Sequence, residues 1–349
     1  MNTPHSWAGF YQEFADKLLA YRNDRQTLIS MLSDVYTRIG MQLPKLTADE
    51  LRDIDPFTIF DLFNKGIKDA NRKKIVAGIA EAFDVRADRP TDFEGIPVLN
   101  NLNATFYAFS NDDRRGENGI DNLWHVFEAE LALAADGNEE TRKAFVKAFD
   151  TTVIQFTLGW KLTMGLYWAR PYNFISLDSR NRWFMADISK AGTGIADIVP
   201  KEKDSPIHDG ERYLAICDTI KSELGSKECS YADFPSLTAA AFVESKRVNR
   251  ERKAAEKVAA ENAEEKRPRR RGGQDHALLG LLPGRQRREV GQLLRTWHNG
   301  HRLEQARQRR EIRQQGRHPQ EPAHPVQQQI LAEELRARAL AVLARNQAG

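Results

Sequence analysis

Apolar side chains recur at helical spacing along most of the first 265 residues. In the first such stretch Trp7, Phe10, Phe14 and Leu18 share one face, and the acidic Glu13 lies on the other. Spacings of three and four residues are typical of an amphipathic helix with one buried face. The pattern predicts a mainly α-helical fold, with helices at 7–19, 24–40, 55–66, 69–83, 123–131, 141–164, 212–224 and 237–265.

Several predicted helices carry recognisable start and stop signals. Asp24 stands where an N-cap is expected, and Asp55-Pro56 opens the aromatic helix that follows. Aspartate can accept a hydrogen bond from a free N–H of the first turn, and proline is tolerated there. Gly40 and Gly66 stand where two of the helices should end.

Two segments depart from the helical pattern. Pro171 should end the helix before it, because proline lacks an N–H donor and restricts the residue that precedes it. Residues 172–177 then alternate loosely and are rich in aromatic and branched side chains, which predicts a short strand. A second short strand is expected within residues 96–109. After residue 177, Asp178 is expected to cap a new helical turn.

The composition divides the chain. Up to Lys266 there are 35 basic and 42 acidic residues, a balance of −7, whereas the rest holds 17 arginines, no lysine and 7 acids, a balance of +10. The helix at 237–265 turns into alternating charge and alanine, which is typical of a solvated helical linker. We therefore expect three parts: a helical domain at 1–240, a charged linker at 241–266, and an arginine- and glutamine-rich tail at 267–349.

The tail has two interpretations. The sudden loss of lysine and gain of arginine is what translation of a GC-rich gene in a different reading frame produces. With suitable codons, residues 277–305 read in another frame can spell a domain-like string that begins HYWAYSPGDNAAKW. The first interpretation is therefore a frameshifted, non-native tail, and the second is a disordered basic arm that binds nucleic acid.

No catalytic, metal or cofactor site is predicted. Cys217 and Cys229 are the only cysteines and lack the spacing of metal ligands, so the sequence favours a reducing cytoplasm. No secretory signal or membrane-spanning segment is visible. The phosphate-binding pattern GxxxxGK[ST] is absent, and Glu244-Ser245-Lys246, which matches half of a nuclease signature, falls in a predicted helix. His125 has no histidine partner at metal-ligand spacing.

Several segments together resemble the N-terminal half of McrB-like proteins, the nucleotide-driven subunits of modification-dependent restriction systems. They are FYQEFADKLLAY, DIDPFTIFDLFNKGI, PTDFEGIPVLNN, IDNLWHVFEAE and TMGLYWARPYNFISLDSRNRWF, in one order over residues 7–250, with the alternate-frame string after them. The resemblance implies a DNA-recognition region that precedes an EVE-like reader of modified bases and an AAA+ motor, which recruits a nuclease subunit. Here the EVE-like domain would lie out of frame and the motor is missing, so nucleotide hydrolysis is not expected of this chain.

The function predicted from these observations is recognition of DNA, with modified DNA as one candidate target, and without chemistry. Two basic clusters supply the candidates, because lysine and arginine contact phosphates while asparagine and aromatic rings read or stack on bases. Lys65, Lys68, Lys73 and Lys74 would anchor phosphates, with Arg180 and Arg182 near the target and Tyr172, Asn173 and Asn181 as base readers. The full set of candidates is Lys65, Lys68, Arg72, Lys73, Lys74, Arg170, Tyr172, Asn173, Arg180, Asn181 and Arg182.

Three alternatives stay open. The aromatic residues of 165–185 and the arginines beside them can serve the core of the domain instead of a surface. The domain can be an assembly module that docks to the motor or nuclease subunit without touching DNA, or the chain can be a remnant without function. Convergence of the basic clusters on one face would favour recognition, and an exposed apolar patch would favour docking.

Overall fold

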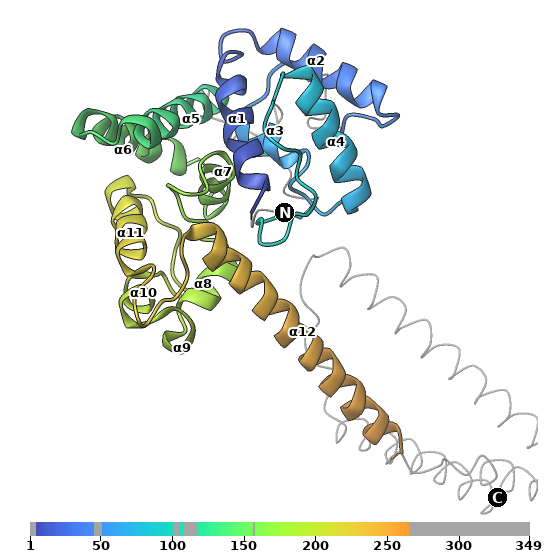
Figure 1. Ribbon diagram of the computed structural model, residues 1–349, viewed down its shortest axis with the longest axis vertical. Helices are drawn as coiled ribbons and strands as arrows, with labels where there is room; N and C mark the ends of the chain where they lie inside the picture. The colour runs from blue at the N-terminus through green and yellow to red at the C-terminus, as the bar shows by residue number, and fades with distance from the viewer. Residues whose placement is uncertain (1–4, 45–50, 101–104, 108–117, 156–157, 266–349) are drawn as a thin grey trace, which may run out of the picture. The chain divides into compact units, whose positions relative to one another are not determined.

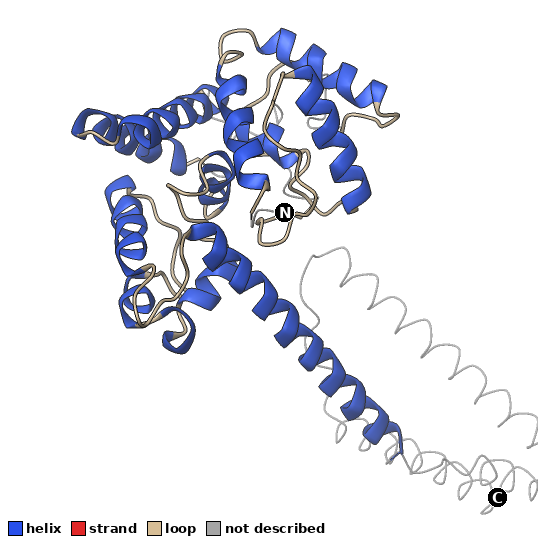
Figure 2. Cartoon of the chain, viewed as in Figure 1, coloured by secondary structure: helices blue, strands red, loops and turns tan. Residues whose placement is uncertain are grey.

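The computed structural model describes residues 5–44, 51–100, 105–107, 118–155 and 158–265 (Figure 1). The predicted basic tail lies outside these residues. By its internal contacts the chain divides into a first unit, Met1–Ala260, and a second, Glu261–Gly349. Figure 2 shows that helices make up the regular structure of the described part, as the periodicity predicted.

Twelve helices are present in the described residues, and their order follows the chain. They are α1 (Trp7–Leu19), α2 (Arg25–Arg38), α3 (Pro56–Asp61), α4 (Asp69–Ala82), α5 (Gly119–Asp136), α6 (Glu139–Val153), α7 (Lys161–Ala169), α8 (Ser179–Met185), α9 (Ile188–Ala191), α10 (Thr193–Ile198), α11 (Gly210–Glu223) and α12 (Phe234–Glu265).

Aromatic contacts hold the first four helices together. The ring of Phe14 on α1 lies 5.1 Å from that of Phe60 on α3 and 5.2 Å from that of Phe83, which ends α4. Both of these Phe14 contacts are edge-on, and edge-on aromatic pairs stabilise a core beyond their buried area. Helices α2 and α4 pack directly against each other. Gly78 on α4 leaves room for Val35 of α2, because a Cβ added at Gly78 would lie only 2.7 Å from Cγ1 of Val35.

Helix α7 connects this group to the remaining helices, because it packs against α1, α3 and α5. Its Trp168 is fully buried and donates a hydrogen bond from Nε1 to the carbonyl oxygen of Pro97 at 3.0 Å. Tyr167 is buried as well, with its hydroxyl 2.6 Å from Oγ1 of Thr238 on α12. Tyr167 and Trp168, two of the aromatic residues of 165–185, therefore belong to the core.

The predicted strand at 172–177 is wrong. The segment is a turn followed by residues without regular secondary structure, and it pairs with no strand in the described residues. Phe174, Ile175, Ser176 and Leu177 are all buried, so burial does not alternate along the segment, and two of its backbone groups bond side chains instead of a neighbouring strand. The Ile175 carbonyl accepts from the Tyr213 hydroxyl, and the Leu177 N–H donates to Thr163 Oγ1, each at 2.9 Å.

The second predicted strand, at 96–109, reduces to one isolated bridge between Leu99 and Lys65 among the described residues. Residues 101–104 and 108–109 of that prediction lie outside them. The helix expected at 141–164 is two helices, α6 and α7. Gly159 stands between them with φ of +43°, a left-handed conformation that glycine adopts without a Cβ clash.

Helix α12 begins on the domain and extends well beyond it. Its first turns are packed, with Leu237 and Ala241 buried, whereas residues 249–260 are all exposed. Figure 1 shows this helix leaving the rest of the first unit. The predicted helical linker is therefore a continuation of the domain's last helix. Within the described residues, none of the helices combines the length and apolarity needed to cross a bilayer.

Candidate nucleic-acid interface

Two of the predicted DNA-contacting residues on α8 are built into the fold. Arg182 is 5% exposed, donates from Nε to the Leu177 carbonyl at 3.0 Å and from one terminal nitrogen to the Lys201 carbonyl at 2.8 Å. Its guanidinium also stacks 4.0 Å from the ring centroid of Trp160. The side-chain amide of Asn181 is buried and donates to the Ser176 carbonyl and to the carboxylate of Asp178.

Lys65 and Arg72, from the other predicted cluster, are also buried. Arg72 donates to the backbone carbonyl of Lys65 at 3.2 Å, and its guanidinium lies 4.8 Å from the ring of Phe93. Lys65 is 7% exposed, and burial lowers the pKa of its ammonium group while the charge of Asp61 opposes that shift. These two side chains fix the connection between α3 and α4.

Arg170 follows α7 and ties that helix to α1. It donates to the Gln12 carbonyl at 3.2 Å and forms an ion pair with Asp16. Asn173 lies in the next turn and donates from its backbone to the Arg170 carbonyl at 3.0 Å. Tyr172 stands out in this turn, because 40% of its surface is exposed and available to another molecule. Arg180 is half-buried, with its guanidinium 5.0 Å from the ring of Phe242 on α12.

The remaining predicted residues, Lys68, Lys73 and Lys74, are exposed and lie in the first half of α4 or at its N-cap. None of them forms an ion pair with another described residue. Lys68 occupies the N-cap position and no side chain caps that end of the helix. Asp69 in the first turn offsets part of this charge, but the three lysines leave a positive surplus, and positive charge at a helix N-terminus attracts anions.

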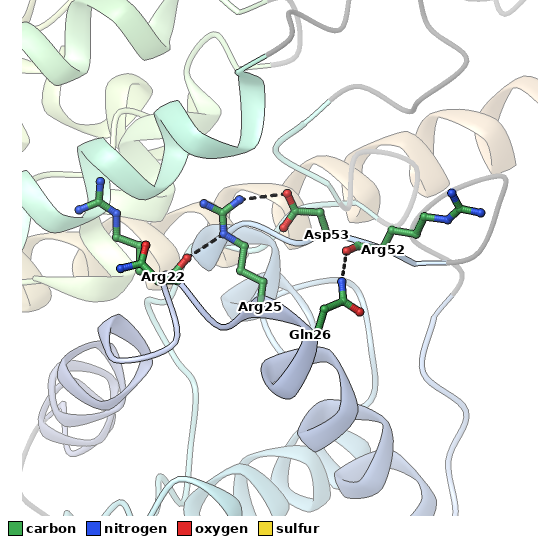
Figure 3. Close-up of a pocket in the computed structure, with 6 residues that line it drawn as sticks. Arg22, Arg25, Gln26, Arg52 and Asp53 are labelled. Atoms are coloured by element: carbon green, nitrogen blue, oxygen red, sulfur yellow. Dashed lines mark hydrogen bonds and ion pairs between the residues drawn. The ribbon is translucent and has the colours of Figure 1, made fainter.

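A hollow of about 380 Å³ lies on the surface beside the start of α2, and the sequence did not indicate it. It is lined by Arg22, Asn23, Arg25, Gln26, Arg52 and Asp53. Figure 3 shows the guanidinium of Arg25 directed at Asp53, 3.0 Å away, and that of Arg52 directed away from it.

The charges of this hollow are largely balanced. Arg25 also pairs with Asp121, and Arg22 pairs with Glu128. Asp53 in turn accepts from the backbone N–H of Ile54 as well as from Arg25. The guanidiniums of Arg22 and Arg25 are therefore paired with carboxylates, which leaves that of Arg52. The hollow thus has less surplus positive charge than the exposed lysines at the start of α4.

A buried ionic cluster lies between α3 and α7. The carboxyls of Asp55 and Asp61 are both fully buried, and burial raises their pKa to about 6 and about 7. Burial lowers the pKa of the Lys161 ammonium group to about 8, and this group donates to the Thr105 carbonyl. Asp55 also caps α3 by accepting from the N–H of Thr58 at 2.9 Å.

This cluster is internal and balances two acids with two lysines. Groups of three or more histidine, cysteine or acidic side chains suited to a metal ion do not occur among the described residues. Cys217 and Cys229 are buried as free thiols, and burial raises the pKa of both, which makes the reactive thiolate scarce.

Three large apolar side chains are exposed on α8, α9 and α12. They are Trp183, Ile188 and Val243, which are 38%, 58% and 57% exposed. Lys190 on α9 links the three helices, since its ammonium group lies 4.3 Å from the ring of Trp183 on α8 and 3.6 Å from the carboxylate of Glu244 on α12. This set is called the α8–α12 patch below.

Comparison with known proteins gives one finding. No curated protein and no solved structure matches the chain. A family model described as a domain of unknown function, DUF8425, matches residues 7–244, which is more than half of the chain and spans α1 to the start of the exposed part of α12. The chain therefore belongs to the DUF8425 family.

Proposed function

We propose that residues 7–244 form a nucleic-acid recognition module, and that the first half of α4 is where it holds the phosphate backbone. The observation that carries the proposal is the exposure of Lys68, Lys73 and Lys74 beside an uncapped helix N-terminus. Backbone N–H groups at such an end point outward, and lysines nearby add positive charge for a phosphate. Three unpaired cations on an otherwise acidic domain concentrate the attraction at one place.

Tyr172 is the candidate for contact with a base. Its ring is 40% exposed, and aromatic rings stack on bases that are unpaired or turned out of a duplex. The proposal keeps the McrB-like setting that the sequence resemblance implied: a cytoplasmic module that contributes specificity to a restriction complex. The motor and nuclease subunits of that complex are its proposed protein partners.

The test compares two triple variants of the full chain. Lys68→Gln/Lys73→Gln/Lys74→Gln removes the proposed anchor, and Lys147→Gln/Lys203→Gln/Lys227→Gln removes the same charge from exposed lysines elsewhere. Both keep the arginine-rich tail, so its contribution to binding is common to them. We expect only the first to weaken binding to methylated and unmethylated duplexes.

Amide hydrogen exchange locates the contact independently of the tail. Bound DNA should slow exchange in the first turns of α4 in the wild-type chain, and this protection should disappear in the Lys68/Lys73/Lys74 variant. Equal affinities of the two triple variants together with unchanged exchange in α4 would exclude this helix as the anchor.

A second candidate function is docking to the motor or nuclease subunit without DNA contact. The α8–α12 patch favours it, because exposed aromatic and branched side chains in one place are typical of protein interaction sites. The double variant Trp183→Ser/Ile188→Ser should then abolish co-purification with a motor or nuclease subunit encoded beside this chain. Unaltered co-purification would remove the candidate.

A further inference from the structure

The ammonium group of Lys190 on α9 lies among aromatic rings and carboxylates. It is 4.3 Å from the ring centroid of Trp183 and 5.9 Å from that of Phe184, both on α8. It also lies 3.0 Å from a carboxylate oxygen of Asp187 and 3.6 Å from one of Glu244 on α12. Aromatic faces and carboxylates both attract a cation, so these four side chains, called the cation site below, form a site that the chain fills with its own lysine.

The walls of the cation site are held by the fold, whereas its occupant is a long and flexible side chain. Phe184 is 3% exposed, and its ring lies 6.0 Å from that of Tyr231. The carboxylate of Glu244 is held by the guanidinium of Arg247 at 2.8 Å. The side chain of Lys190 is 22% exposed, and its four-carbon stem can rotate into solvent without a change in the backbone. The site can therefore exchange its own lysine for another cation.

The chain around the cation site is acidic. Residues 183–198 and 223–233 together contain five acids and two lysines, a balance of −3. These two segments are in contact, since the backbone N–H of Thr193 donates to the carboxylate of Glu228 at 3.0 Å. Negative charge of this kind attracts a positively charged partner and repels the phosphates of a nucleic acid.

Exposed apolar side chains stand next to both carboxylates of the site in the sequence. Ile188 follows Asp187 and is 58% exposed, and Val243 precedes Glu244 and is 57% exposed. A free ammonium ion would offer the site nothing that Lys190 does not already supply. A peptide segment can also cover these apolar side chains, and burial of apolar surface favours its binding.

We propose that the α8–α12 patch binds a segment of a partner protein through one lysine or arginine side chain, which replaces Lys190 in the cation site. Apolar residues beside that side chain cover Ile188 and Val243. Lys190 lowers the affinity of the patch, because only those molecules in which it has left the site can accept the partner. The proposal rests on the second candidate function, docking at this patch, and is independent of nucleic-acid binding by α4.

Fluorescence anisotropy of labelled synthetic peptides measures the docking to the full chain. One peptide has a central lysine between leucines, and its control has norleucine there, which keeps the hydrocarbon stem without the charge. The Lys190→Ala chain should bind the lysine peptide about tenfold more tightly than the wild type, because Lys190 no longer competes for the site. Trp183→Ser should weaken this binding, and Lys203→Ala, which removes an exposed lysine outside the site, should leave it unchanged.

Three results would overturn the proposal. Equal affinities for the two peptides in every chain would show that the patch docks apolar segments without recognising a cation, so docking would stand without this chemistry. Binding of neither peptide to the Lys190→Ala chain would exclude docking of a basic segment. Self-association of that variant in sedimentation, without peptide binding, would make a second copy of the chain the occupant. The peptides carry no phosphate, so none of these results depends on the lysines of α4.

Discussion

Replacing Asp61 by asparagine should stabilise the domain, and the gain should grow with pH. Asp61 ends α3, is 0% exposed, and neither of its carboxylate oxygens has a hydrogen-bond partner among the described residues. Burial raises its pKa from 3.8 to about 7, although the charges of Lys65 and Lys161 lower it and Asp55 adds to the rise. The folded state therefore resists ionisation of this carboxyl.

The magnitude follows from the difference between the two pKa values. Between pH 3.8 and about 7 the carboxyl is ionised in the unfolded chain and protonated in the folded chain, so stability falls as pH rises. Each pH unit costs about 1.4 kcal/mol, which gives about 4 kcal/mol once pH exceeds 7. Asparagine cannot ionise, so the Asp61→Asn variant keeps its free energy of unfolding over this pH range. The attraction of Lys65 and Lys161 for the carboxylate needs no separate correction, because it already contributes to the pKa of Asp61.

Urea denaturation of the full chain, followed by circular dichroism at a series of pH values, measures the effect. The Asp61→Asn variant should match the wild type near pH 4 and exceed its free energy of unfolding by about 4 kcal/mol above pH 7. Asp88→Asn, which removes an exposed carboxylate from the loop after α4, controls for the loss of one charge. A variant that is less stable than the wild type above pH 7 would refute the reasoning.

Two further predictions concern packing and a buried arginine. Gly165→Ala should cost about 1–3 kcal/mol of unfolding free energy in thermal or urea denaturation, because the new Cβ would lie 2.5 Å from Cδ1 of Phe57. Gly9→Ala meets no atom within 4 Å in α1 and should not destabilise, so equal losses in the two variants would contradict this packing. Arg182→Gln should cost about 2 kcal/mol through lost charged hydrogen bonds, yet leave the DNA affinity of the folded protein unchanged in a binding titration. A lower DNA affinity of the Arg182→Gln variant without a loss of unfolding free energy would show that Arg182 contacts DNA.

The helices were predictable because their apolar spacing is regular and their caps are local. Asp24, Asp55 and Asp178 each accept a backbone N–H of the first turn of α2, α3 and α8. The turn at the start of residues 172–177, where the sequence predicted a strand, was not predictable. A run of aromatic and branched residues looks the same in sequence whether its backbone bonds a neighbouring strand or, as here, the side chains of Tyr213 and Thr163.

The candidate site was predictable only in part. The sequence identified the basic clusters but not which of their side chains face solvent. On α4, Lys73 and Lys74 are exposed, whereas Arg72 is buried with its guanidinium against the ring of Phe93. On the short helix α8, side chains one residue apart point in different directions, so Arg182 is buried and Trp183 is exposed. The hollow beside α2 joins Arg22 and Arg25 to Arg52, far along the chain, which no local pattern indicates.

The salt dependence of DNA binding tests most directly whether the lysines of α4 hold a phosphate backbone. Each phosphate that a cation neutralises contributes about 0.9 to the slope of log affinity against log salt. The slope of the Lys68→Gln/Lys73→Gln/Lys74→Gln chain should therefore be shallower than that of the wild type by about 2.7, and that of the Lys147→Gln/Lys203→Gln/Lys227→Gln chain should be unchanged. Identical slopes for all three chains would contradict the proposal.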